Sequence, residues 1–197
     1  MVRLTILFFA LLIGMNTFYS QISDDDEIYF RKGLVRASAT ISPGRMLANK
    51  SNSIYISGFL EYLMVSNFTF RGDVFQYVDG KYTHNSIVEP KFMNRLCFGS
   101  AKYFGSGNWQ NYFAAQAGLT TVKYPFSSIE NRWGFLPTVS FKLGTSFYVW
   151  KYFHFFADVT YFGSRLRGTA TGNVGFNDLV FSGGLGFQIN TIRAKKN

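Results

Sequence analysis

The sequence predicts an all-β fold: a closed eight-stranded antiparallel up-and-down β-barrel that crosses a membrane. First, apolar and polar residues alternate with a period of two in eight successive segments, as they do in strands with one apolar face. Second, the connections between the segments alternate between long and short. Third, the 197 residues are 19% aromatic and only 16% charged, yet the mean hydropathy is +0.03. Apolar and polar residues are therefore interleaved, without the runs of about 20 apolar residues that transmembrane helices need.

The first twenty residues have the pattern of a secretory signal peptide. Arg3 supplies the positive start, residues 4–14 form an apolar stretch, and Ser20 precedes the expected cleavage site. The stretch is shorter than the 18 or more residues expected of a membrane-spanning helix. The alternative for this segment is a strand or helix of the folded core.

The eight predicted strands follow residue 32 and are about ten residues long, which is the length a membrane-spanning strand requires. They cover residues 33–42, 54–64, 68–78, 95–104, 111–124, 137–149, 152–163 and 178–190. Alternation is clearest over 137–149, where Val139 and Phe141 flank Ser140. It is weakest over 95–104, where Ser100 and Lys102 are assigned to the polar face.

The connections predict one rim of loops and one rim of tight turns. Long connections over 43–53, 79–94, 125–136 and 164–177 alternate with short ones over 65–67, 105–110 and 149–151. All four prolines lie in or beside long connections, so we expect none inside a strand, where proline would remove a ladder hydrogen bond. An even number of strands puts both chain ends at the rim of short turns.

Strand register is predicted from the short turns. A three-residue turn over 65–67 sets Glu61 opposite Arg71, and Asn67 suits the left-handed position of that turn. A similar turn over 149–151 would set Lys142 opposite Asp158.

The charged residues of the strands recur on one face, and we expect that face to line the barrel. Seven residues form the predicted interior salt-bridge network: Arg36, Glu61, Arg71, Asp73, Lys102, Lys142 and Asp158. Their charges nearly balance, as an internal network requires. Tryptophans gather at strand ends and predict two interfacial girdles: Trp109, Trp133 and Trp150. The alternative is a soluble lipid-binding barrel, with the polar face in water.

The last predicted strand, with spaced Phe181, Leu185, Phe187 and Ile189, resembles the final strand of the small eight-stranded outer-membrane barrels of Gram-negative bacteria, the OmpX and OmpA-barrel type. The resemblance covers about residues 33–190 and is architectural. In that family this strand resembles the signal read by the barrel-assembly machinery, and it usually ends the chain with an aromatic residue. Here residues 191–197 follow it, which is a departure from the family pattern.

The resemblance implies an outer-membrane location, with both termini periplasmic and the long loops outside. The expected organisation is a signal peptide over 1–20, a periplasmic N-terminal segment over 21–32, the barrel over 33–190 and a basic periplasmic tail over 191–197. Outer-membrane lipid and lipopolysaccharide are the expected surroundings. The barrel-assembly machinery is the expected partner during insertion, and another outer-membrane protein complex is a further candidate.

An eight-stranded barrel is just wide enough to be filled by its own side chains, so we expect no open channel. The function predicted from this is non-enzymatic: the protein acts through its extracellular loops or as a subunit of an outer-membrane complex. Four basic loop residues are candidates for contacts with lipopolysaccharide phosphates: Arg45, Lys50, Arg165 and Arg167. The alternative is that these residues only keep exposed loops soluble.

Two other functions stay open. A lipid A-modifying enzyme would use His84 in the second long loop, since His154 is expected at the opposite end of the barrel. A soluble secreted lipid-binding barrel is the other. No cofactor is expected, and the sequence contains no metal-ligand spacing, phosphate loop or nucleic-acid-binding module. The single cysteine, Cys97, excludes an intramolecular disulfide.

Overall fold

The computed structural model describes residues 30–47, 51–65, 67–81, 90–125, 131–169 and 172–192. The predicted signal peptide lies outside these residues and stays a prediction. The strands are β1 (Leu34–Met46), β2 (Ser51–Val65), β3 (Phe68–Lys81), β4 (Phe92–Ser106), β5 (Trp109–Pro125), β6 (Asn131–Trp150), β7 (Phe153–Thr169), β8 (Gly172–Gly175) and β9 (Asp178–Asn190). No helix among the described residues is long and apolar enough to cross a membrane.

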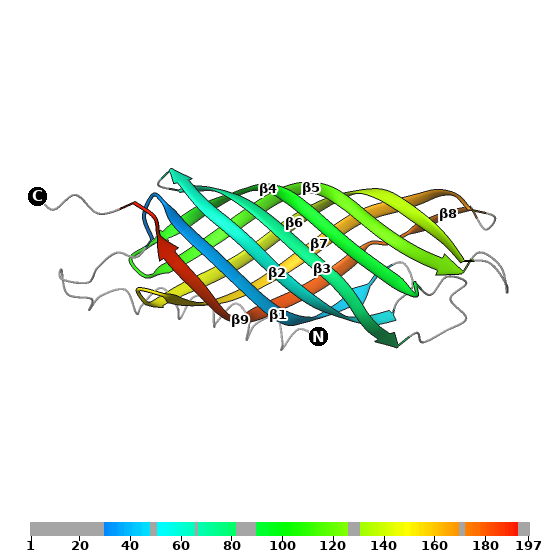
Figure 1. Cartoon of the computed structure of the whole chain (residues 1–197), viewed down its shortest axis with the longest axis horizontal. Helices are drawn as coiled ribbons and strands as arrows, with labels where there is room; N and C mark the ends of the chain where they lie inside the picture. Colours follow the sequence, from blue (N-terminus) through cyan, green and yellow to red (C-terminus); the bar gives the residue numbers. More distant parts are fainter. Residues whose placement is uncertain are drawn as a thin grey trace, which may run out of the picture.

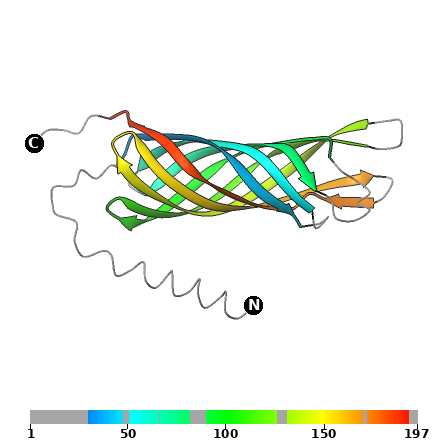
Figure 2. The ribbon, with the colours of Figure 1, turned by 90° about the horizontal axis from the view of Figure 1, so that it is seen from below.

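Eight of these strands form a closed antiparallel barrel, as predicted (Figures 1 and 2). Each strand from β1 to β7 pairs with the next, and β9 pairs with both β7 and β1, which closes the ring. The short strand β8 pairs with the C-terminal end of β7 and lies beyond the ring. The start of β1 and the end of β9 lie at one rim with the three short turns, here called the turn rim. The opposite end is the loop rim.

The alternation in sequence places apolar side chains outside and polar side chains inside. In β6, Phe141 and Leu143 are 48% and 62% exposed, whereas Ser140 and Lys142 are 1% and 2% exposed. The outer wall carries exposed large apolar residues on each of the eight barrel strands. Such a wall is suited to hydrocarbon, where a closed barrel also pairs backbone groups that water cannot reach.

The strands run further toward the loop rim than predicted. The prediction that prolines avoid strands was wrong for Pro43, Pro125 and Pro137, which pair with Ile54, Asn131 and Leu119 respectively. At each of these prolines the strand pairs with only one of its two neighbouring strands. The β6–β7 ladder begins only at Thr138. A proline needs no partner on such a side, because it has no N–H to donate.

The missing ladder beside Pro43 belongs to the seam between β1 and β9. The two strands pair at Ala37 with Phe187 and again at Gly44 with Val180, in one register, with no ladder pair between. Within this gap the Thr40 hydroxyl donates to the Gly183 carbonyl oxygen at 2.8 Å. A side chain therefore bridges the strands where the backbone ladder is interrupted.

One predicted register is confirmed and the other is wrong. Glu61 lies opposite Arg71, as expected. Lys142, however, lies opposite Thr160 rather than Asp158. The ladder shifts between Tyr148 and Trp150, because the turn is formed by residues 151–152 and an irregularity precedes it. This displaces the pairing by two residues.

Barrel closure predicts a specific cross-link. In a Cys97→Ser background, the pair Ala37→Cys and Phe187→Cys should form a disulfide, because directly opposed residues have Cα atoms about 4.5–5.5 Å apart. Oxidation followed by denaturing electrophoresis measures the cross-linked fraction. The matched control pairs Ala37→Cys with Leu185→Cys, which is two residues out of register and on the same face of β9. Equal or greater cross-linking of the control would contradict the closed register.

Candidate functional site

The centre of the lumen holds a guanidinium shared among three carboxylates. Arg71, on β3, is fully buried. Its Nε lies 2.9 Å from Oδ2 of Asp73, its Nη1 3.4 Å from Oε2 of Glu61, and its Nη2 3.6 Å from Oδ2 of Asp158. These acids come from β3, β2 and β7, so one arginine connects distant parts of the wall.

Two further cations complete this central group. Nζ of Lys142 lies 2.6 Å from Oδ1 of Asp73 and 3.6 Å from Oδ2 of Asp158. Nη1 of Arg36 lies 3.5 Å from Oε2 of Glu61. The predicted proximity of Lys142 and Asp158 therefore exists, although they are diagonal neighbours in the ladder. Three cations and three anions lie together, and none of these residues is more than 5% exposed.

Tyrosine hydroxyls add hydrogen bonds to two carboxylates of the central group. Tyr103 donates to Oε1 of Glu61 at 2.8 Å and accepts from Arg36 at 2.6 Å. Tyr112 donates to Oδ2 of Asp158 at 2.8 Å. Each added hydrogen bond offsets part of the desolvation of the buried ions.

A second ion pair lies nearer the loop rim and was missed from the sequence. Nη1 of Arg95 lies 2.6 Å from Oδ2 of Asp178, and the Tyr55 hydroxyl donates to the same carboxylate. The described interior thus contains four cations and four anions: Arg36, Arg71, Arg95, Lys142, Glu61, Asp73, Asp158 and Asp178. The balance explains how so many charges can lie in a closed barrel.

Lys102 was wrongly predicted to lie in the lumen. It faces outward between the buried Ala101 and Tyr103. The large apolar residues Leu96 and Phe98 occupy the same even positions of β4 and also face outward. Apolar residues, rather than the polar lysine, therefore reveal the lipid-facing side of this strand. Near the turn rim, a lysine can extend its ammonium group toward the interface.

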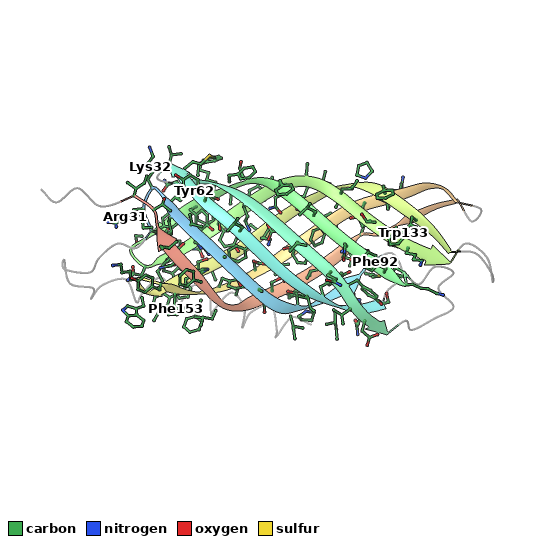
Figure 3. All side chains as sticks on the ribbon, viewed as in Figure 1. Arg31, Lys32, Tyr62, Phe92, Trp133 and Phe153 are labelled. Carbon is green, nitrogen blue, oxygen red and sulfur yellow. The ribbon has the colours of Figure 1, made fainter. Side chains whose placement is uncertain are left out.

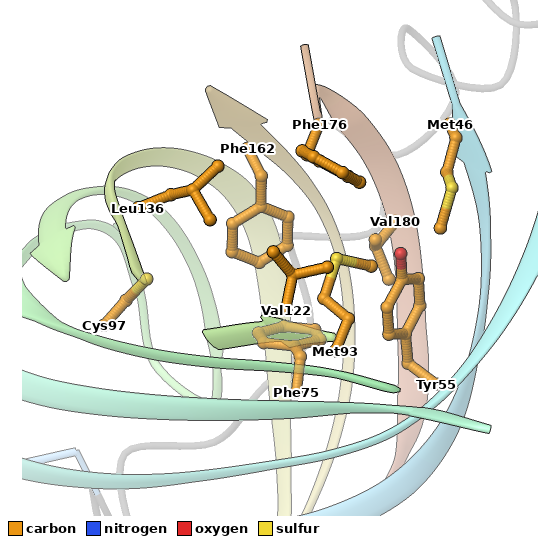
Figure 4. Packing of buried hydrophobic residues seen from close by; sticks show 10 residues of the cluster. All are labelled: Met46, Tyr55, Phe75, Met93, Cys97, Val122, Leu136, Phe162, Phe176 and Val180. Carbon is orange, nitrogen blue, oxygen red and sulfur yellow. The ribbon is translucent and has the colours of Figure 1, made fainter. Parts of the chain in front are cut away.

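The loop-rim half of the lumen is filled by apolar side chains. Figure 4 shows Phe75, Phe162 and Phe176 with their neighbours inside the barrel. The Phe75 and Phe162 rings pack edge to face, with centroids 4.8 Å apart. The guanidinium carbon of Arg95 lies 4.7 Å from the centroid of the Phe162 ring, so the second ion pair packs directly against this apolar group.

Aromatic side chains close the turn-rim half. Phe30, which precedes β1, is 8% exposed and lies against Tyr103, with ring centroids 4.7 Å apart. It also packs on Tyr148 at 5.6 Å. The chain therefore covers its own turn-rim opening with a phenylalanine just before the first strand.

One void inside the described barrel, beside Lys142, Asp158 and Ser182, has a volume of about 10 Å³. This is close to the space of one water molecule. The filled interior and apolar exterior contradict the alternative of a soluble lipid-binding barrel, which needs an apolar cavity and a polar exterior.

The two histidines differ in what the structure describes. His154 is fully buried in the lumen near the turn rim, with its ring between Phe59 and Tyr148 at centroid distances of 6.2 and 5.8 Å. His84 lies outside the described residues, so an enzymatic role for it stays a prediction. No group of three or more His, Cys, Asp or Glu in the described part of the chain is arranged to hold a metal ion.

The loop rim carries exposed basic side chains. Arg45, on β1, and Arg165, on β7, are both exposed. Of the other two predicted contacts, Lys50 lies outside the described residues, and the side chain of Arg167 is likewise not described. Lys91, also exposed, joins the described basic residues at this end.

The three tryptophans lie at the two rims, as predicted. Trp133 is at the loop rim, 5.5 Å from Phe92 between ring centroids (Figure 3). Trp109 packs on Phe147 at 5.5 Å near the turn rim, where Trp150 is 62% exposed. Their separation supports the two predicted girdles.

Comparisons with solved structures show the same fold. The outer membrane protein OprG from Pseudomonas aeruginosa matches with a TM-score of 0.58 and 11% identity, over 84% of this chain and 100% of that chain. The N-terminal β-barrel domain of P. aeruginosa OprF matches with 0.53 and 15%, over 80% and 98%. Ail, the attachment invasion locus protein of Yersinia pestis, in complex with the heparin analogue sucrose octasulfate, matches with 0.53 and 14%, over 80% and 99%.

No family model matches the sequence, and no curated protein is significantly similar to it. The chain has the fold of the small eight-stranded outer-membrane barrels, as the resemblance of its last strand predicted.

The Arg95–Asp178 pair offers a test of the charge balance in the lumen. Arg95→Met should lower the free energy of unfolding by about 3–5 kcal/mol, because it leaves a buried carboxylate without its cation. Adding Asp178→Asn should recover part of that loss, since no uncompensated charge remains. Urea unfolding in detergent micelles measures the three proteins. A double variant no more stable than Arg95→Met would contradict the account.

Proposed function

We propose that the protein is a non-enzymatic integral outer-membrane β-barrel that acts through its loop rim, alone or as a subunit of an outer-membrane complex. The observation that carries this proposal is the lumen, in which paired ions and packed aromatic rings leave a void of about 10 Å³. A filled barrel offers no internal path or pocket, so its exposed rims and outer wall are the surfaces that can act.

The outer-membrane location rests on the distribution of side chains. The wall is apolar on every barrel strand, and tryptophans mark both ends. In this orientation the turn rim and both termini are periplasmic, and the loop rim is outside. The likeness to OprG and OprF supports the same location.

We further propose that the loop rim contacts lipopolysaccharide. Arg45, Lys91 and Arg165 are exposed there, and arginine pairs bidentately with phosphate. Ail, a barrel of the same fold, was solved with a sulfated heparin analogue. Phosphates and sulfates are both anionic oxygen clusters, so a basic rim is the chemistry that recognises them.

Planar-bilayer recording tests the filled lumen. The purified protein should give no steady conductance above that of a protein-free bilayer, because ions cannot enter a lumen filled by side chains. Protein that is folded by its heat-modifiable migration on gels should be used for the recording. Steady large conductance steps would overturn this part of the proposal.

Charge reversal tests the rim. Arg45→Glu with Arg165→Glu should weaken binding of purified lipopolysaccharide by about tenfold or more, since two charge-assisted contacts become repulsive. Binding is measured by titration in an uncharged detergent. Lys151→Glu, at the turn rim, is the control and should bind like the natural protein. Equal affinity for the double variant and the natural protein would contradict lipopolysaccharide recognition by this rim.

A further inference from the structure

The outer wall contains a groove of about 660 Å³ across β4 and β5. It lies within the size range of ligand-binding pockets. The residues that line it are mostly apolar, and its one charged residue is Lys102. The groove is on the face that the proposed membrane location exposes to lipid, so this inference rests on that location.

Strand register explains the shape of the groove. Strand pairing sets four residues side by side on β3, β4, β5 and β6: Phe70, Ser100, Ala115 and Phe141. Two small side chains therefore lie between two aromatic ones. Ala117 extends the small floor toward the loop rim.

Phe98, Phe113 and Phe141 line the groove, and Phe98 and Phe113 each belong to a stacked pair of rings. Phe70 stacks on Phe98 with centroids 6.4 Å apart, and Phe113 stacks on Phe141 at 6.3 Å. The Phe98 ring lies over Gly72 on the neighbouring strand β3, and Ala115 and Ala117 of the floor are exposed. A floor of small side chains between aromatic ones matches an extended hydrocarbon chain.

Lys102 lies at the turn-rim end of this groove, about 7 Å along β4 from Ser100. It is exposed, makes no ion pair with a described residue, and has no carboxylate among the residues that line the groove. A charge on the lipid-facing side of a barrel is unfavourable toward the bilayer centre and tolerated near the interface, where it can meet a lipid phosphate.

We propose that this groove binds a glycerophospholipid of the periplasmic leaflet, with an acyl chain along its floor and the phosphate against Lys102. Charge complementarity selects this occupant: an uncompensated cation at headgroup level attracts an anionic headgroup. A zwitterionic lipid carries its own ammonium group, which the lysine repels, so an anionic lipid is preferred.

Native mass spectrometry of the protein in an uncharged detergent tests the proposal, with phosphatidylglycerol and phosphatidylcholine as probes. The natural protein should retain phosphatidylglycerol more tightly. Lys102→Gln should lower its affinity by about fivefold and remove the preference between the two lipids. Ala115→Leu, which fills the floor, should weaken both lipids.

Matched controls distinguish the groove from the rest of the wall. Lys151→Gln removes a charge at the same rim, and Ala157→Leu adds the same bulk to the outer face of β7; both should bind lipid like the natural protein. If the groove variants behave like these controls, the proposal is overturned. Cross-linking in cells gives a second test. A photoreactive residue that replaces Phe141 should cross-link to phospholipid. A stoichiometric cross-link to a protein would overturn the proposal that a lipid occupies the groove.

Cell fractionation separates this failure from failure of the proposed function. Absence of the protein from the outer membrane would contradict its proposed location. A protein found there whose groove variants bind lipid like the controls would contradict the groove alone.

Discussion

The structure depends on the buried ion network centred on Arg71. Strands whose outer faces meet lipid must place their polar side chains inside, and in an eight-stranded barrel those side chains have nowhere else to go. Arg71 joins Asp73, Glu61 and Asp158 from three strands. Removing one partner of such a group leaves an uncompensated buried charge, so the network favours the arrangement of β2, β3 and β7 in which its charges are paired.

This constraint also decides where function can reside. Paired ions fill the middle of the lumen, the Phe75 cluster fills the loop-rim half, and Phe30 covers the turn-rim opening. The surfaces left are the loop rim, with Arg45 and Arg165, and the apolar wall. On that wall, Lys102 and the small floor beside it form the most distinct feature. Under the proposed function, contacts with lipid or with a partner are therefore made by these outer surfaces.

The fold was predictable because period-two alternation depends only on local sequence, and so was the Glu61–Arg71 register, which follows from a short turn. The Lys142–Asp158 register was not, because the turn is formed by residues 151–152 instead of 149–151, whereas a comparable irregularity before the β2–β3 turn leaves the Glu61–Arg71 pairing as predicted. Lys102 was misplaced because polarity was weighed above its shared spacing with Leu96 and Phe98. That spacing would also have placed Arg95 inside.

The central claim, a water-excluding lumen with its charges paired, can be tested by amine labelling of the protein folded in phospholipid vesicles. A water-soluble amine reagent, followed by peptide mass spectrometry, compares buried Lys142 with exposed Lys151 in one sample. The account predicts that Lys151 is modified, whereas Lys142 is protected until the protein is unfolded. Modification of Lys142 at the rate of Lys151 in the folded protein would contradict the account.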